Sequence, residues 1–134
     1  MSGTDWGGRL VISPGRLLYV GPAATAERHA HHAIQFVVGL EANVSLKLDK
    51  KSLSRQATVV CSGAAHAFDA GGRRIALLLV DSHDARVRAT AKTLHGEELG
   101  PHLEVAEVPS TEWEAPRLMG WAESILKHLG LGAE

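Results

Sequence analysis

Short apolar runs separated by turn residues recur along the first part of the chain, and this spacing constrains the fold more than any other feature. Such runs lie at residues 10–12, 17–20, 44–48, 56–61 and 75–80. In the third run Val44, Leu46 and Leu48 alternate with polar residues, the period of a strand with one wet face. Seven or more short strands at regular spacing predict a β-sandwich or barrel.

The turns between these runs carry their own signals. Pro14 and Gly15 split the first two runs, which predicts two strands around a Pro-Gly turn. Residues 49–52 read as a polar turn, and residues 69–72 (Asp-Ala-Gly-Gly) as a hairpin turn. The run at 75–80 is apolar on both faces and predicts a buried strand.

The last third of the chain has helical spacing instead. Asp84 is a suitable cap for a helix that carries Val87, Ala91 and Leu94 and stops before Gly96. Residues 97–109 read as a loop with one strand at 103–105. A second helix follows Pro116, ends at Gly130 and bears an apolar stripe of Leu118, Trp121, Ala122, Ile125 and Leu129. We therefore expect a barrel over residues 1–82 and a helical extension over 83–134, within one structural domain.

Composition excludes several classes of protein. The chain has 134 residues, of which 45% are hydrophobic and 22% charged, as in globular proteins. Its net charge of −1 gives no field that would attract nucleic acid, so we expect no direct nucleic-acid binding. There is no signal-peptide pattern, no run of membrane-spanning length and a single cysteine, Cys61, so we expect a cytoplasmic protein without disulfides.

A histidine-rich segment at residues 28–39 holds the candidate site. If it is one extended strand, His29, His31 and Gln35 share a face, whereas His32 lies on the other face with Ile34, Phe36 and Val38. Neutral imidazoles bind borderline metals such as Zn, Ni, Cu and Fe. His66, on a later predicted strand, is the candidate fourth polar residue.

These residues resemble the two motifs of the cupin superfamily, whose fold is a small jelly-roll β-barrel. Gly21, His29, His31, Gln35 and Gly39 follow the first motif with altered spacers, and Gln35 replaces its glutamate. In the second motif Cys61 replaces the proline, while Gly63 and His66 keep their places. The resemblance covers roughly residues 9–91 and implies a mainly β fold with a metal site formed by His29, His31, His66 and Gln35.

A narrower resemblance is to the N-terminal cupin sensor domain of AraC-type transcription regulators. It rests on residues 17–22, on the histidine segment and on the trailing helices. Those regulators continue into helix-turn-helix units, whereas only four residues follow Gly130 here. The resemblance implies either a sensor domain without a DNA-binding domain or a stand-alone cupin. It also implies a homodimer that pairs through helical residues such as Leu118, Trp121, Ile125 and Leu129.

Other interpretations of the same residues stay open. Gln35 is either a weak oxygen ligand or a hydrogen-bond partner that fixes an imidazole. The histidines either bind metal or line a barrel mouth without it. Tyr19, Phe36 and Phe68 either line a ligand pocket or form plain core, and the helical stripe packs on the barrel or on a second copy.

Two functions follow as hypotheses. The first is a binding or sensor domain that holds a divalent transition metal or a small molecule in the barrel, with a role in transcriptional regulation. The second is a small metal-dependent dioxygenase or isomerase in which histidines hold the metal and leave positions open for substrate. The motif holds no general acid or base carboxylate, which favours binding over catalysis.

Overall fold

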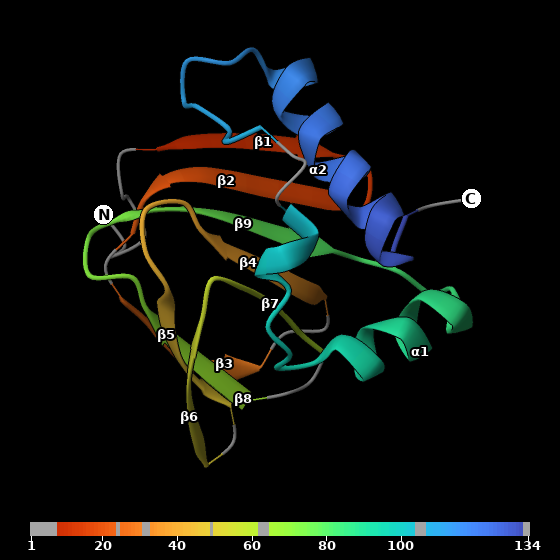
Figure 1. The fold of residues 1–134 in the computed structure, drawn as a ribbon. Helices are drawn as coiled ribbons and strands as arrows, with labels where there is room; N and C mark the ends of the chain where they lie inside the picture. Colours follow the sequence, from red (N-terminus) through yellow and green to blue (C-terminus); the bar gives the residue numbers. More distant parts are fainter. Residues whose placement is uncertain are drawn as a thin grey trace.

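The computed structural model describes residues 8–23, 25–30, 33–48, 50–61, 65–103 and 107–132, without the side chains of residues 25–30, 65 and 66. Strands precede helices along the chain (Figure 1). The strands are β1 (Arg9–Ser13), β2 (Arg16–Pro22), β3 (Thr25–Ala30), β4 (Ile34–Gly39), β5 (Val44–Leu48), β6 (Lys51–Arg55), β7 (Ala57–Val60), β8 (Ala65–Asp69) and β9 (Arg74–Val80). The helices are α1 (Ala85–Leu94), the 3-10 helix η1 (Gly100–Leu103) and α2 (Ala115–Leu129).

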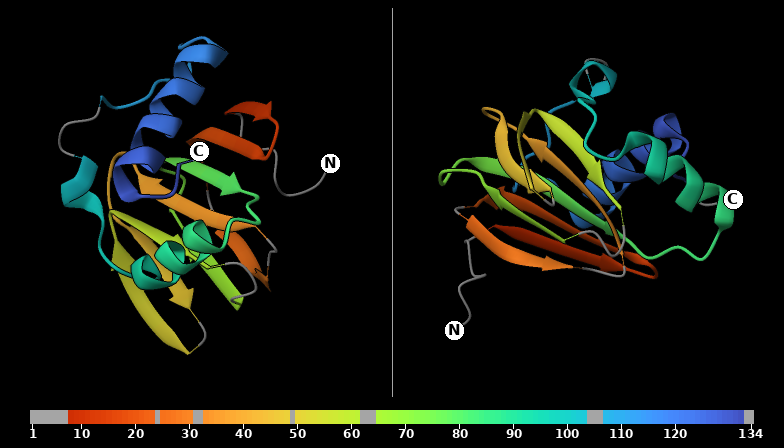
Figure 2. Two further views of the ribbon diagram at one scale, coloured as in Figure 1. Left: turned by 90° about the vertical axis from the view of Figure 1, so that its right-hand side faces the viewer. Right: turned by 90° about the horizontal axis from the view of Figure 1, so that it is seen from below.

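The strands form two antiparallel sheets that face each other (Figure 2). One sheet has the order β1-β2-β9-β4-β7 and the other has the order β3-β8-β5-β6. The prediction of a mainly β chain followed by two α-helices is therefore confirmed. Over the described strands the hydrogen-bonded ladders make two separate sheets, and no ladder joins them into a closed barrel.

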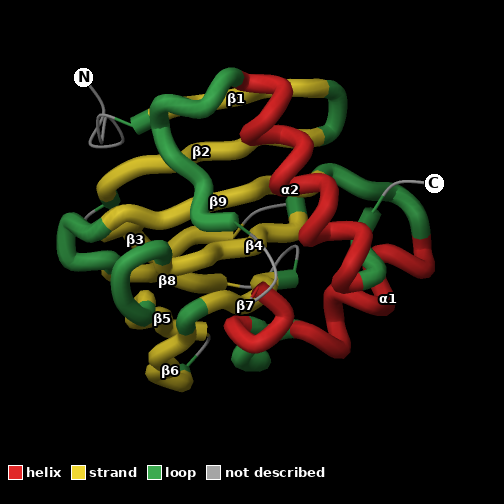
Figure 3. Tube along the Cα trace, turned by 45° about the horizontal axis from the view of Figure 1, so that its top comes forward, coloured by secondary structure: helices red, strands yellow, loops and turns green. Residues whose placement is uncertain are grey.

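β4 and β7 of the five-stranded sheet are buried along their whole length, which explains their nearly continuous apolar sequence. Ile34, Phe36 and Val38 on β4 pack with the helices, whereas Val37 packs toward the second sheet. Figure 3 shows α2 running across β1, β2 and β9, with α1 beside β7. The chain thus has one core between the sheets and another beneath the helices.

Several local predictions are confirmed. β1 and β2 form the hairpin around Pro14 and Gly15, where Gly15 adopts a φ of 71° that suits glycine. In β5 the apolar side chains are buried and those of Ser45 and Lys47 exposed. Asp84 caps α1 by accepting a hydrogen bond from the Arg86 N–H, and α2 ends at Gly130 in the left-handed region.

Two local predictions are wrong, and a third is confirmed only in part. Residues 28–39 are not one strand, because β3 and β4 belong to different sheets. The turn at residues 69–72 is not a hairpin, since β8 and β9 also lie in different sheets. The polar turn predicted at 49–52 is confirmed at Lys50, but it is shorter than expected because β6 begins at Lys51. β6 is an edge strand, on which charged residues are common.

The region before α2 also differs from the prediction. Leu103, expected to start a short strand, ends the 3-10 helix η1 instead, and Glu104 and Val105 lie outside the described residues. A hydrogen bond from Arg16 Nε on β2 to Glu123 Oε2, at 2.7 Å, attaches α2 to the sheet.

In the described part of the chain, none of the helices is both long and apolar enough to cross a membrane.

Candidate metal site and a neighbouring cleft

Three of the predicted ligand positions, 29, 35 and 66, lie on strands that meet at one end of the sandwich, where the chain crosses twice between the sheets. Residues 31–33 join β3 to β4, and residues 61–64 join β7 to β8. Ala30 pairs with Ala65 in one sheet, and Gln35 pairs with Val60 in the other. Connections this short span only a few residue lengths, so the ends of all four strands lie close together.

His29 and His66 occupy opposite positions in the antiparallel ladder between β3 and β8. On its other side His66 pairs with Leu48 of β5, whose side chain belongs to the core between the sheets. Phe68, two residues further along β8, belongs to the same core. The backbone therefore pairs two histidines that are far apart in sequence.

The ladder of β3 is irregular just before the histidine. The register shifts between Ala26 and His29, as happens at a β-bulge. Bulges bend a strand and redirect the residues beside them, and they are common next to functional sites. The third predicted histidine ligand, His31, lies outside the described residues, as does His32.

Gln35 lies on β4 of the five-stranded sheet, between Val60 of β7 and Leu79 of β9. It is only 2% exposed. Val37, two residues along the same strand, and Val60 both belong to the core between the sheets, so Gln35 is on the inward face. The predicted separation of Gln35 from Ile34, Phe36 and Val38 is confirmed, although Gln35 and His29 come from different sheets.

The predicted aromatic pocket is divided between the two cores. Tyr19 and Phe68 belong to the core between the sheets, and the Tyr19 hydroxyl donates a 2.6 Å hydrogen bond to the Pro22 carbonyl. Phe36 belongs to the core beneath the helices. A ligand between the sheets would therefore meet Tyr19 and Phe68 without Phe36.

The helical stripe is largely covered within the chain itself. The side chains of Leu118, Ile125 and Leu129 are buried in the core that α2 shares with the sheet, and Trp121 packs against it half-buried. These four residues thus leave little apolar surface for a second copy. A homodimer would have to pair mainly through other residues.

Thr58 is a polar residue of the interior that the sequence did not single out. It lies opposite Val37 on the inward face of β7 and is 0% exposed. Its Oγ1 atom has no hydrogen-bond partner in the described structure. Because Thr58 lies within an apolar run, the sequence indicated only an ordinary strand residue. The pairing of β7 with β4 shows that Thr58 faces the other sheet.

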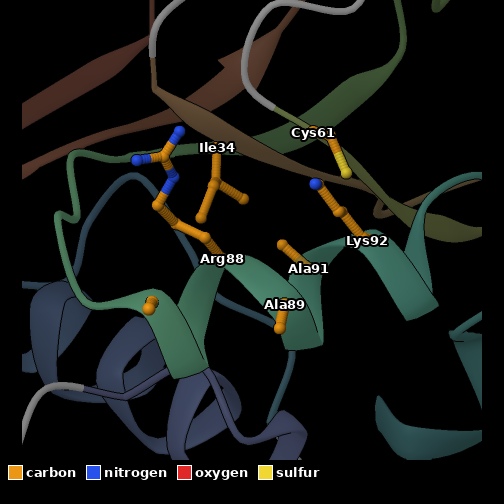
Figure 4. Close-up of a pocket in the computed structure, with 7 residues that line it drawn as sticks. Ile34, Cys61, Arg88, Ala89, Ala91 and Lys92 are labelled. Carbon is orange, nitrogen blue, oxygen red and sulfur yellow. The ribbon is translucent and has the colours of Figure 1, made fainter.

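A cleft of about 430 Å³ lies outside this sandwich end, between α1 and the ends of β4 and β7 (Figure 4). Its lining residues are Ile34, Cys61, Ala85, Arg88, Ala89, Ala91 and Lys92. The Cys61 N–H donates a 3.0 Å hydrogen bond to His95 Nδ1, which fixes the start of the crossing after β7. Burial raises the pKa of the Cys61 thiol, and the Lys92 charge opposes that rise.

Metal-ligating groups do not otherwise cluster in the part of the chain that the structure describes. Among those side chains, no three of His, Cys, Asp or Glu gather in a way that could hold an ion. The side chains of His29, His31 and His66 lie outside that description. The histidine set therefore rests on the sequence and on the backbone pairing of His29 with His66.

Solved structures resemble the chain over little more than half of its length. A protein of unknown function from Streptococcus pyogenes, SPY1581, is 18% identical with a TM-score of 0.50, and the match covers 57% of this chain and 75% of that one. KdgF from Halomonas is 15% identical with a TM-score of 0.47, covering 57% of this chain and 78% of that one. A cupin-2 domain protein from Shewanella frigidimarina is 12% identical with a TM-score of 0.47, covering 55% and 78%.

The similarity to the streptococcal protein shows a shared fold over the matched part. No protein family model matches the sequence, and no curated protein matches it.

Proposed function

We propose that this chain is a cupin-type binding domain that holds a divalent transition metal where the strands cross between the sheets. His29, His31 and His66 would be its imidazole ligands, and Gln35 would supply an amide oxygen or hold an imidazole in place. The observation that carries the proposal is the backbone pairing of His29 with His66. It brings the two sequence motifs to one position in the fold.

The chemistry of the donor set fits such an ion. Three imidazoles with an amide oxygen suit Zn, Ni, Cu or Fe, which accept nitrogen ligands readily. All four groups are neutral, so the bound ion would keep its full positive charge. That charge would favour an anionic small molecule at any remaining coordination position.

Gln35 can serve this site only if its amide is available on the inward face. The side chain is almost fully buried there, beside Val60 and Leu79. A buried amide is costly unless it is hydrogen-bonded or coordinated, so a polar role at this position is expected. Tyr19 and Phe68, in the same core, would form the apolar surroundings of a bound small molecule.

The proposal includes a sensor role in transcriptional regulation, in which occupancy of the site is passed on through a cytoplasmic homodimer. Its support is the resemblance of residues 17–22 and of the histidine segment to AraC-type sensor domains. Light scattering of the purified chain, with and without metal, tests the dimer. A monomer under both conditions would remove the dimer from the proposal.

Elemental analysis of protein purified without an affinity tag tests the metal itself. We expect about one equivalent of transition metal in the wild type, and loss of that metal in His66→Ala and His29→Ala. His83→Ala is the matched control, because His83 is exposed and precedes α1. Metal-free wild-type protein that also shows no thermal shift with Zn, Ni, Cu or Fe would refute the proposal.

A further inference from the structure

The cleft between α1 and the sheet carries two cationic side chains that the proposed metal site does not use. Arg88 and Lys92 stand one turn apart on the same face of α1, and both line the cleft. Figure 4 shows both side chains rising from the helix toward the ends of the strands, on either side of Ile34. Positive charge is therefore concentrated at the opening of one cavity.

Neither cation is neutralised by the part of the protein that the structure describes. The side chains of Arg88 and Lys92 form no hydrogen bond or ion pair with a described residue, and none of the described lining residues is acidic. Asp84, the carboxylate nearest in sequence, caps the helix and faces Arg86 instead. The two charges are thus available to a ligand.

The remaining lining is apolar and small. Ile34 and the alanines Ala85, Ala89 and Ala91 form most of it, with the half-buried Cys61 at one side. The volume of about 430 Å³ lies within the range of small-molecule sites, roughly 300–1,000 Å³. An apolar surface with a few convergent charged groups is the usual composition of such sites.

We propose that this cleft binds a small organic anion, with its carboxylate or phosphate held by Arg88 and Lys92 and a compact apolar group against Ile34 and the alanines. The guanidinium of Arg88 matches two oxygens of either anion, and the ammonium of Lys92 adds a point charge. We propose it as a second site, because none of the described residues that line the cleft is a predicted metal ligand.

Titration calorimetry with benzoate and with phenyl phosphate tests the proposal at constant ionic strength. We expect saturable binding of at least one probe by the wild type, and at least a tenfold loss in the double variant Arg88→Gln/Lys92→Gln. Both positions are exposed, and glutamine is a good helix former, so the fold should persist. The probe that binds more tightly identifies the headgroup class.

Cys61 provides a reporter of where the probe binds, because it is the single cysteine of the chain. A bound probe should slow its alkylation by neutral iodoacetamide in the wild type and not in the double variant. Without a probe, the rate ratio of iodoacetate to iodoacetamide should fall roughly fivefold in the double variant, the effect of one unit charge at about 4 Å in water. This ratio cancels any change in the thiolate fraction.

Arg86→Gln is the control, since it removes one positive charge from the same helix, as each of the two cleft substitutions does, at a position outside the cleft lining. It should leave both binding and the alkylation ratio close to the wild type. Absence of saturable binding for both probes, or equal binding by the double variant, would overturn the proposal. An equal loss of probe binding in Arg86→Gln and in the double variant would overturn it as well. Such a result would indicate that the probes respond to the overall positive charge of the helix and not to a defined site.

Discussion

His29 and His66 stand opposite each other in the ladder between β3 and β8, although they are 37 positions apart in the sequence. Directly opposed residues of antiparallel strands have Cα atoms about 4.5–5.5 Å apart. That separation is within the range that a disulfide can bridge. The pairing can therefore be tested by cross-linking, independently of any metal.

In a Cys61→Ala background, the double variant His29→Cys/His66→Cys should form an intramolecular disulfide on mild oxidation. Mass spectrometry of peptides after digestion detects the bond. The control is His29→Cys/Ala67→Cys, in which the second cysteine is moved by one position and so to the other face of β8. Equal cross-linking in the two variants would contradict the register.

Replacing the buried amide by a carboxylate should make stability depend on metal. Gln35→Glu places a charge or a protonated acid at a position that is 2% exposed, so metal-free protein should lose several kcal/mol of folding free energy. A bound cation would offset much of that loss. Thermal melts with and without Zn²⁺ should show a larger metal-induced rise in Tm for Gln35→Glu than for the wild type.

Gln35→Leu is the matched control, because it keeps the size of the side chain and removes its oxygen. Its melting temperature should respond to Zn²⁺ no more than that of the wild type. If Gln35→Glu also shows no metal-induced stabilisation, Gln35 does not lie next to the metal.

Replacing Thr58 by valine should stabilise the protein. The hydroxyl has no hydrogen-bond partner in the described structure, so its removal relieves a desolvation cost and keeps the β-branched shape. We expect a gain of about 1 kcal/mol in the free energy of unfolding, measured by urea denaturation. A loss of stability would show that the Thr58 hydroxyl has a partner in solution.

Glu98 should contribute to the loss of stability in acid. Burial raises its pKa, but the backbone N–H groups of Gln56, Gly100 and Ala57 donate to its carboxylate, and the net result is a pKa below 4.5. A carboxyl whose folded-state pKa is depressed stabilises the fold above its unfolded pKa, and this contribution is lost as the pH falls through the folded pKa.

Glu98→Gln should therefore lower stability at neutral pH and flatten its decline below about pH 4.5, the unperturbed value. Urea midpoints measured from pH 3 to pH 7 check this, with Glu112→Gln as an exposed control. Parallel pH profiles for the wild type and Glu98→Gln would contradict the assigned role.

Local sequence patterns predicted those strands and helices whose apolar periodicity or capping residue lies within the element itself. The alternation around Leu46 and the cap at Asp84 are signals contained within a few residues. The break between β3 and β4 is different, because the period-two pattern continues from His29 to Gln35 across the crossing. β3 and β4 are distinguished only by their partners, β8 for β3 and β9 for β4. Pairing between strands that are far apart in sequence leaves no signal in the local sequence.

The same limit applies to the sites. The motif spacing indicated that His29 and His66 belong together, and the ladder pairs them. The cleft was not predicted, because it depends on how α1 packs beside Cys61 at the end of β7. Nothing in the sequence distinguishes Arg88 and Lys92 from the charged residues of an ordinary exposed helix face.

X-ray absorption spectroscopy of the zinc-loaded protein tests the central claim most directly, because it counts the ligands around the ion. Three imidazoles with an oxygen ligand and no sulfur are predicted for the wild type. His66→Ala should lose one imidazole or fail to bind the ion. Sulfur from Cys61 in the zinc shell, or a shell unchanged in His66→Ala, would contradict the claim that the His29–His66 pair forms the metal site.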